Sequence, residues 1–166
     1  MSSSPTRGRY DEQAMPELDS EALDFRAASE LFAPVRKLKR ADLETLRLAT
    51  KHQGRNVPTV GGMLLFGKQR ERFFPDAWIQ AGRFPGTDKS KIADSVEIRG
   101  YPVQAVEEAL AFVHGHALHG MEIGAVRRKD RWNLPLVAMR EAIINAVAHA
   151  DYAQRAAFPS RETRRA

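Results

Sequence analysis

Residues 140–152 read Arg-Glu-Ala-Ile-Ile-Asn-Ala-Val-Ala-His-Ala-Asp-Tyr and carry more information than any other part of the chain. They predict a helix over about 135–150, in which Glu141, Asn145 and His149 follow one another at steps of four. Such steps keep side chains on one side of an α-helix, and the residues between these three are mainly apolar. A buried helix rarely carries a Glu and an Asn on one stripe unless both have partners, so the stripe is a candidate functional surface.

Glu141 and Asn145 have side chains that suit a nucleotide site. The amide oxygen of an Asn is a good ligand for Mg²⁺, and a Glu one turn earlier can accept a proton from a water that attacks a phosphate. The other interpretation is structural: the polar stripe forms hydrogen bonds with a neighbouring strand. The residues of the helix alone leave the two interpretations equally open.

Composition excludes several classes of protein. The chain of 166 residues contains no Cys, which excludes disulfides, thiol catalysis and zinc sites built on Cys. No apolar run approaches the roughly 20 residues of a membrane span, and residues 1–9 lack the apolar core of a secretory signal. We therefore expect a cytoplasmic protein with no membrane partner.

The positive charge is concentrated in two places. Residues 125–166 hold nine Arg or Lys against four Asp or Glu, which equals the whole net charge of +5. Basic clusters bind phosphate backbones, so two basic blocks, residues 36–40 and residues 127–131, are candidate nucleic-acid sites. The alternative for the first block, 36–40, is a solvated surface with local acid–base pairs. The alternative for the second block, 127–131, is a surface loop with Trp132 in the core. The candidate residues are Arg36, Lys37, Lys39, Arg40, Arg127, Arg128, Lys129 and Arg131.

The remaining pattern predicts an α+β protein with helices and a small mixed sheet, because helices and short strands occur in mixed order. Residues 1–20 are expected to be a disordered lead-in, and residues 153–166 a disordered basic tail. Helices are predicted over about 21–32, 41–50 and 103–119, and strands over about 59–66, 76–84, 95–99 and 122–128.

One glycine pattern has the spacing of a phosphate-binding loop. Gly62-Met63-Leu64-Leu65-Phe66-Gly67-Lys68 fits that spacing, but Gln69 stands where a Ser or Thr should reach Mg²⁺. The Met-Leu-Leu-Phe interior favours burial, whereas a phosphate cradle needs exposed backbone amides. We therefore predict a core strand here.

The wider sequence resembles one family, over about Tyr10 to Arg155. It is similar to bacterial transcriptional regulators that join a Schlafen-type AlbA-like DNA-binding domain to a divergent histidine-kinase-like (GHKL) ATPase domain, often labelled RecG-like C-terminal. Glu141 to Ala146 resembles the N-box of the gyrase, heat-shock-protein-90, histidine-kinase and MutL ATPases. The residues that carry the wider resemblance are Val60–Lys68, Phe74–Pro75, Gly82–Lys89 and Arg140–Ala146, with His149, Asp151 and Tyr152.

The resemblance implies roles for the helix residues and an organisation for the chain. It implies Glu141 as the base that activates water, Asn145 as the Mg²⁺ ligand, and ATP, Mg²⁺ and DNA as the molecules bound. His149 and Asp151 stand where the family has a similar His and Asp beside the cofactor. Residues 59–152 would be the first half of the ATPase domain. Separately, two short predicted helices before a strand resemble the end of a winged-helix unit, so residues 21–58 are expected to be a helical, winged-helix-like linker. Family members are often named helicases, but a helicase needs a complete phosphate-binding loop.

The departures from the family are large. The family has its AlbA-like domain before the segment that starts at Tyr10, and it continues after Tyr152 into a glycine-containing box. Here no glycine follows Gly124, so nothing lets a phosphate approach the backbone closely. We therefore expect a truncated, catalytically silent member: a fragment of an ATP-binding, DNA-binding regulator. The alternatives are an ATPase completed by a partner or a second protomer, and a non-enzymatic interaction module.

Overall fold

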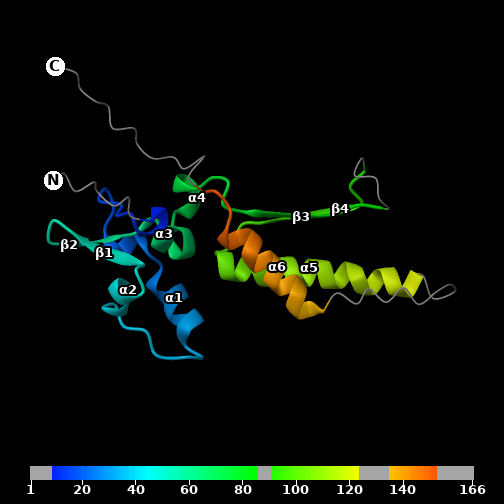
Figure 1. Ribbon diagram of the computed structural model, residues 1–166, viewed down its shortest axis with the longest axis horizontal. Helices are drawn as coiled ribbons and strands as arrows, with labels where there is room; N and C mark the ends of the chain where they lie inside the picture. The colour runs from blue at the N-terminus through cyan, green and yellow to red at the C-terminus, as the bar shows by residue number, and fades with distance from the viewer. Residues whose placement is uncertain (1–8, 86–90, 124–134, 153–166) are drawn as a thin grey trace, which may run out of the picture. The chain divides into compact units, whose positions relative to one another are not determined.

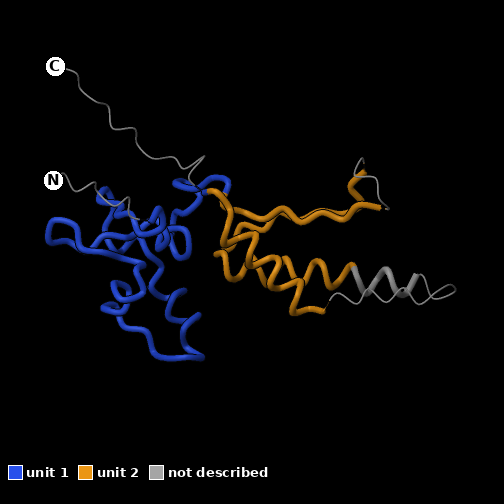
Figure 2. The backbone as a smooth tube through the Cα atoms, viewed as in Figure 1, with its two compact units in different colours: residues 1–76, 152–166 blue, residues 77–151 orange. Residues whose placement is uncertain are grey.

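The computed structural model describes residues 9–85, 91–123 and 135–152 (Figure 1). The chain divides into two compact units (Figure 2): unit 1 comprises residues 1–76 and 152–166, and unit 2 comprises residues 77–151. The predicted α+β class is confirmed. In the described part of the chain, the strands form two separate antiparallel pairs in place of one mixed sheet. The boundary between the units follows Asp76, whereas the sequence suggested a boundary after residue 58.

The described part of unit 1 begins with an ordered segment, residues 9–22. It contains two short 3₁₀ helices, η1 (Tyr10–Glu12) and η2 (Ser20–Ala22). Between them Met15 is only 1% exposed, and its N–H donates to the carbonyl of Pro58 at 2.9 Å. The prediction of a disordered lead-in is therefore wrong for residues 9–20, because one apolar side chain fixes the segment; residues 1–8 lie outside the described residues.

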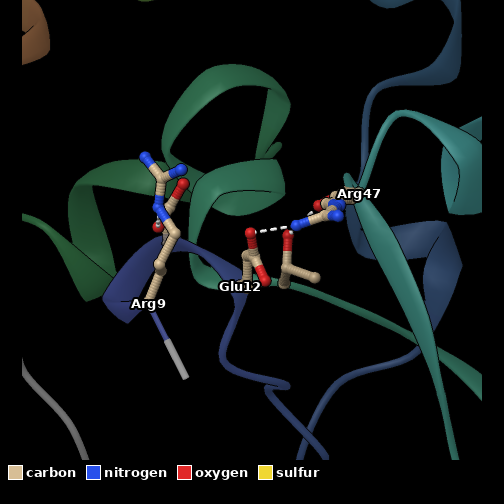
Figure 3. Close-up of polar contacts among 5 residues, drawn as sticks. Arg9, Glu12 and Arg47 are labelled. Atoms are coloured by element: carbon tan, nitrogen blue, oxygen red, sulfur yellow. Dashed lines mark hydrogen bonds and ion pairs between the residues drawn. The ribbon is translucent and has the colours of Figure 1, made fainter. Parts of the chain in front are cut away.

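An ion pair also holds this segment. Glu12 of η1 accepts a hydrogen bond from the guanidinium of Arg47, a residue far away in the sequence (Figure 3). Arg9 lies on the neighbouring turn and pairs with Asp11 at 3.6 Å. Exposed pairs of this kind contribute little to stability, about 0–1 kcal/mol each, so Met15 contributes the larger share of the anchoring.

Two predicted helices are shorter than expected. The helix predicted over 21–32 is α1 (Phe25–Phe32), which starts where the Asp24 carboxylate accepts a hydrogen bond from the N–H of Ala27 at 3.0 Å. The helix predicted over 41–50 is α2 (Asp42–Thr45). It ends early because Arg47 takes a left-handed conformation with φ of 58°, which a right-handed helix does not allow.

A hairpin that the sequence did not predict follows α2. Strands β1 (Ala49–His52) and β2 (Arg55–Pro58) pair antiparallel. The two-residue loop between them consists of Gln53 and Gly54, with φ of 49° and 79°. Positive φ at both loop residues is the conformation that matches the twist of the flanking strands.

The apolar run after β2 forms a helix, so the predicted core strand is wrong. This helix, α3 (Val60–Phe66), buries five of its seven residues. The Thr59 side chain caps it by accepting a hydrogen bond from the N–H of Gly62 at 3.0 Å. A Cβ on Gly62 would lie 1.9 Å from the carbonyl oxygen of Leu48, so glycine is required for this close approach. The short α4 (Arg70–Phe73) follows.

Unit 2 agrees closely with the prediction. It contains the hairpin of β3 (Ile79–Arg83) and β4 (Asp94–Ile98), then the long α5 (Pro102–Ile123) and α6 (Leu136–Ala148). The strand predicted over 122–128 is wrong at its start, where α5 continues to Ile123, and the rest lies outside the described residues.

One buried cluster of unit 2 consists of Ile98 from β4 with Ala105 and Ala109 from α5, and the partly buried Ile79 and Ile143 pack against it. Val106 and Leu110 of α5 are buried as well. Among the described residues, none of the helices combines the length and the apolar character needed to cross a membrane.

Candidate functional site

Helix α6 carries the predicted N-box residues, and two of its side chains attach it to α5. Arg140 donates hydrogen bonds to both carboxylate oxygens of Glu107, one of them at 2.9 Å. These bonds raise the pKa of Arg140 above its ordinary value. Ile143 packs against the buried cluster of unit 2. Because Arg140 and Ile143 face α5, residues about a third of a turn away on α6 face outward.

Glu141 and Asn145 lie together, as the spacing predicts. The Nδ2 atom of Asn145 donates to Oε1 of Glu141 at 3.4 Å, and both side chains are exposed. This distance is long for an N–H···O bond, so the interaction is weak and the pair can reorient. Within the part of the chain that the structure describes, neither side chain bonds to a strand, so the contacts do not support the structural interpretation.

Apolar residues flank this pair on the same face of the helix. Val137 and Ile144 are 78% and 40% exposed, and they lie four residues before and three residues after Glu141. We call Val137, Glu141, Ile144, Asn145 and Ala148 the exposed stripe of α6. Although the helix is rich in apolar side chains, none of its 13 residues, all of them described, is buried.

The two candidate residues after α6 do not continue the helix. His149 is its C-terminal cap, with its N–H donating to the carbonyl of Asn145 at 3.0 Å, and its side chain is exposed. Asp151 is exposed as well. Tyr152 belongs to unit 1, where burial raises the pKa of its phenol and the nearby charge of Arg70 lowers it by a smaller amount.

The oxygen atoms of the exposed stripe fit Mg²⁺ better than a transition metal. Mg²⁺ takes oxygen ligands and commonly uses only one or two protein groups, with phosphates and water completing its octahedron. Asn145 supplies an amide oxygen, and Glu141 supplies a carboxylate one turn earlier. Among the described residues, no group of three or more His, Asp or Glu side chains could hold a metal ion. Such a group would be needed to bind a metal without help from substrate phosphates.

The first basic block is partly neutralised by acidic neighbours. Arg36 lies 3.8 Å from the Asp42 carboxylate. Arg40 donates two hydrogen bonds to Glu21, at 2.5 and 3.3 Å, and stacks over the ring of Phe25. Lys37 and Lys39 are exposed and have no ion pair among the described residues. Local acid–base pairing, the alternative for this block, therefore holds for its two arginines.

The second basic block lies outside the described residues. These candidate residues are Arg127, Arg128, Lys129 and Arg131, together with the neighbouring Trp132. Their assignment as nucleic-acid contacts stays a prediction from the sequence.

Gly62 in α3 and Gly67, which caps the C-terminal end of α3, have backbone amides that already have partners. Gly62 N–H donates to Thr59 Oγ1, and Gly67 N–H donates to the carbonyl of Met63 at 2.9 Å. A phosphate cradle needs several such N–H groups to be available to the ligand. The segment is therefore a packed helix.

Sequence reasoning missed one group of basic residues. The group consists of Lys51, His52 and Arg55, which lie around the turn between β1 and β2. The sequence predicted no strand in this part of the chain, which follows the helix predicted over about 41–50. The signal that marks them is the absence of Asp and Glu from residues 45–70, a run that contains five Arg or Lys.

No family model, curated protein or solved structure matches this chain. The roles considered for α6 and for the basic residues therefore rest on their chemistry and on the resemblance of the residues quoted above.

Proposed function

We propose that this chain is a cytoplasmic, DNA-binding transcriptional regulator that binds ATP with Mg²⁺ along the exposed stripe of α6 and does not hydrolyse it. The observation that supports the nucleotide role is the Glu141–Asn145 pair, in which Nδ2 of Asn145 lies 3.4 Å from Oε1 of Glu141. The pair lies on the outward face of α6, and Arg140 and Ile143 hold this helix against α5. The resemblance to the N-box ATPases gives the pair its expected ligand.

Asn145 is the residue on which binding depends. Its amide nitrogen points at Glu141, which leaves the amide oxygen available as a ligand for Mg²⁺. When the nucleotide is bound, its phosphates supply further oxygen ligands to the cation. His149, at the end of the same helix, can donate a hydrogen bond from a ring N–H to a phosphate oxygen.

Glu141 has the chemistry of a base, but hydrolysis has a second requirement. Phosphoryl transfer depends on donors that hold the phosphates while charge develops. Such donors are commonly backbone amides beside glycine, and the amides of Gly62 and Gly67 already have partners within unit 1. We therefore propose binding without turnover.

A nucleotide titration tests this proposal. Isothermal calorimetry of the whole chain with ATP and Mg²⁺ should give saturable binding that Asn145→Ala weakens by about tenfold or more, the loss of a charge-assisted contact. The matched control is Gln104→Ala, an exposed amide on α5, which should bind like the wild type. Absence of binding by the wild type, or equal binding by Asn145→Ala, contradicts the site. Mg²⁺-dependent hydrolysis that disappears in Glu141→Ala contradicts the silent role.

The flanking apolar residues favour a second candidate function, an ATPase completed by a second protomer. Val137 and Ile144 lie beside Glu141, and exposed apolar side chains at helical spacing are typical of contact surfaces. A contact that covers them would bring another chain beside the candidate base. In this case sedimentation equilibrium shows a dimer that Val137→Asp dissociates, and hydrolysis per chain rises with protein concentration. A monomer at all concentrations rejects this candidate.

The proposed DNA role rests on the positive charge. Binding through phosphates releases counterions, so affinity should fall steeply with added salt. The exposed Lys37 and Lys39 contribute more than Arg36 and Arg40, because the arginines already face carboxylates. No binding of duplex DNA at low salt dismisses the role. A chain that binds neither nucleotide nor DNA is the non-enzymatic interaction module.

A further inference from the structure

The hairpin of β1 and β2 carries a basic tip that no prediction covered. Figure 1 shows the loop between these strands protruding from the body of unit 1. The hairpin, residues 49–58, contains Lys51 and Arg55 and no acidic residue, and both lie in its tip, residues 51–56. In comparison, residues 36–44 hold four basic and two acidic residues.

The strand register gives the tip two faces. Lys51 is paired with Asn56, and His52 with Arg55. Because side chains alternate along a strand, Lys51 and Asn56 lie on one face of the ribbon and His52 and Arg55 on the other. All four are exposed except His52, which is partly exposed. The turn residue Gln53 adds an exposed amide at the end of the ribbon.

The charge of the tip is not neutralised by carboxylates. The guanidinium of Arg55 donates to the backbone carbonyl of Pro16 at 3.1 Å, a neutral acceptor that fixes the side chain and leaves its charge intact. A guanidinium has five N–H donors, so most of them remain available. Within the described residues, Lys51 forms no ion pair. By contrast, Arg36, Arg40 and Arg47 each face a carboxylate.

We infer that the β1–β2 hairpin is a contact site for duplex DNA, in which Lys51 and Arg55 bind phosphates on either side of the ribbon. The inference rests on the proposed DNA-binding function and assigns it to residues outside the 36–40 block. A two-stranded ribbon fits the major groove of B-form DNA, which is about 12 Å wide. The amides of Gln53 and Asn56 lie at the tip of the hairpin. In the major groove, such amide side chains can form hydrogen bonds with the edge of an adenine.

The test is the affinity of the whole chain for a fluorescent DNA duplex, measured by anisotropy over a series of salt concentrations. The variant Lys51→Gln/Arg55→Gln should bind roughly tenfold more weakly, and the slope of log affinity against log salt should fall by about two, one for each phosphate contact. The matched control is Arg9→Gln/Arg26→Gln, which also removes two exposed charges. Both of its arginines already pair with Asp11 and Glu30, so its affinity and slope should stay near those of the wild type.

The outcomes separate this inference from the proposed function. If the wild type binds no DNA, both fail. If it binds and the hairpin variant keeps the wild-type slope while Lys37→Gln/Lys39→Gln loses affinity, the hairpin site is wrong and the DNA role stands. Equal affinity for duplex RNA also overturns the inference, because the major groove of A-form helices is too narrow for the ribbon.

A second measurement does not depend on the variants folding. Hydrogen exchange of the wild-type chain should show protection of residues 50–57 when duplex DNA is added. Protection confined to other parts of the chain overturns the inference.

Discussion

Helices α3 and α6 have similar apolar sequences and opposite surroundings. α3 buries five of its seven residues in unit 1, whereas α6 buries none of its 13 in unit 2, and all residues of both helices are described. The difference comes from the neighbours. Gly62 lets α3 approach the backbone at Leu48, whereas among the described residues α6 packs through Ile143 against the buried cluster of unit 2. Apolar composition alone therefore does not distinguish a core helix from a helix that offers a surface.

The largest effect expected from this difference is on stability. Met63 of α3 is 1% exposed and Val137 of α6 is 78% exposed. Met63→Ala should lower the free energy of unfolding by about 2–5 kcal/mol, because it leaves a cavity in the core. Val137→Ala should change it by less than about 0.5 kcal/mol. Urea titration followed by circular dichroism measures both, and equal losses in the two variants break the comparison.

A smaller loss is expected from filling the space at Gly62. A Cβ there meets the Leu48 carbonyl at 1.9 Å, so Gly62→Ala should lower the free energy of unfolding by about 1–3 kcal/mol through overpacking. The matched control is Gly115→Ala in α5, where no atom lies within 4 Å of the added Cβ. In that helix the exchange should stabilise by up to about 1 kcal/mol. Thermal melts of the two variants should shift in opposite directions, and a stabilised Gly62→Ala is inconsistent with the packing of α3.

The N-terminal caps of α3 and α6 should differ by about 1 kcal/mol in what they contribute to the free energy of unfolding. Thr59 Oγ1 accepts from Gly62 N–H at 3.0 Å and donates to the Arg47 carbonyl at 2.7 Å. Thr59→Ala should therefore cost about 1–2 kcal/mol of unfolding free energy. Pro135 precedes α6 and makes no side-chain cap bond, so Pro135→Ala should cost less. The same urea titration checks this order, and a larger loss from Pro135→Ala would reverse it.

The smallest effect concerns pH and the residue that follows α6. Burial raises the pKa of the Tyr152 phenol above its ordinary value of about 10, although Arg70 lowers it in part. The folded state thus holds this proton more tightly than the unfolded state. The associated stability is fully present below about pH 10 and is lost as the pH rises through the folded pKa. Tyr152→Phe should remove this loss and flatten the stability profile above about pH 10, where the unfolded phenol ionises. An unchanged pH profile argues against the burial of this ring.

Unit 2 was largely predictable from its sequence because its patterns are long and clear. Helices α5 and α6 show apolar residues at helical spacing, and β3 and β4 end near glycine or proline. The pairing of Glu141 with Asn145 follows from the same spacing. Their exposure does not follow, because it depends on which elements pack against α6.

Unit 1 was harder to predict because its elements depend on contacts between distant residues. The apolar run of α3 has the length of a strand, and the helix depends on the close approach of Gly62 to the carbonyl of Leu48, which lies earlier in the sequence. Met15 fixes a segment that is otherwise polar. The turn between β1 and β2 uses a left-handed Gln53, a residue that gives no sequence signal for such a turn.

The most direct test of the exposed stripe as a nucleotide-binding surface is the NMR signal of the Asn145 side-chain amide. On addition of ATP with Mg²⁺, this signal should shift in a saturable way, and without Mg²⁺ the shift should be much smaller because the amide oxygen binds the cation. The amide of Gln104 on α5 should stay in place. An Asn145 signal that does not respond to Mg²⁺-ATP, while other signals shift or none do, contradicts the account.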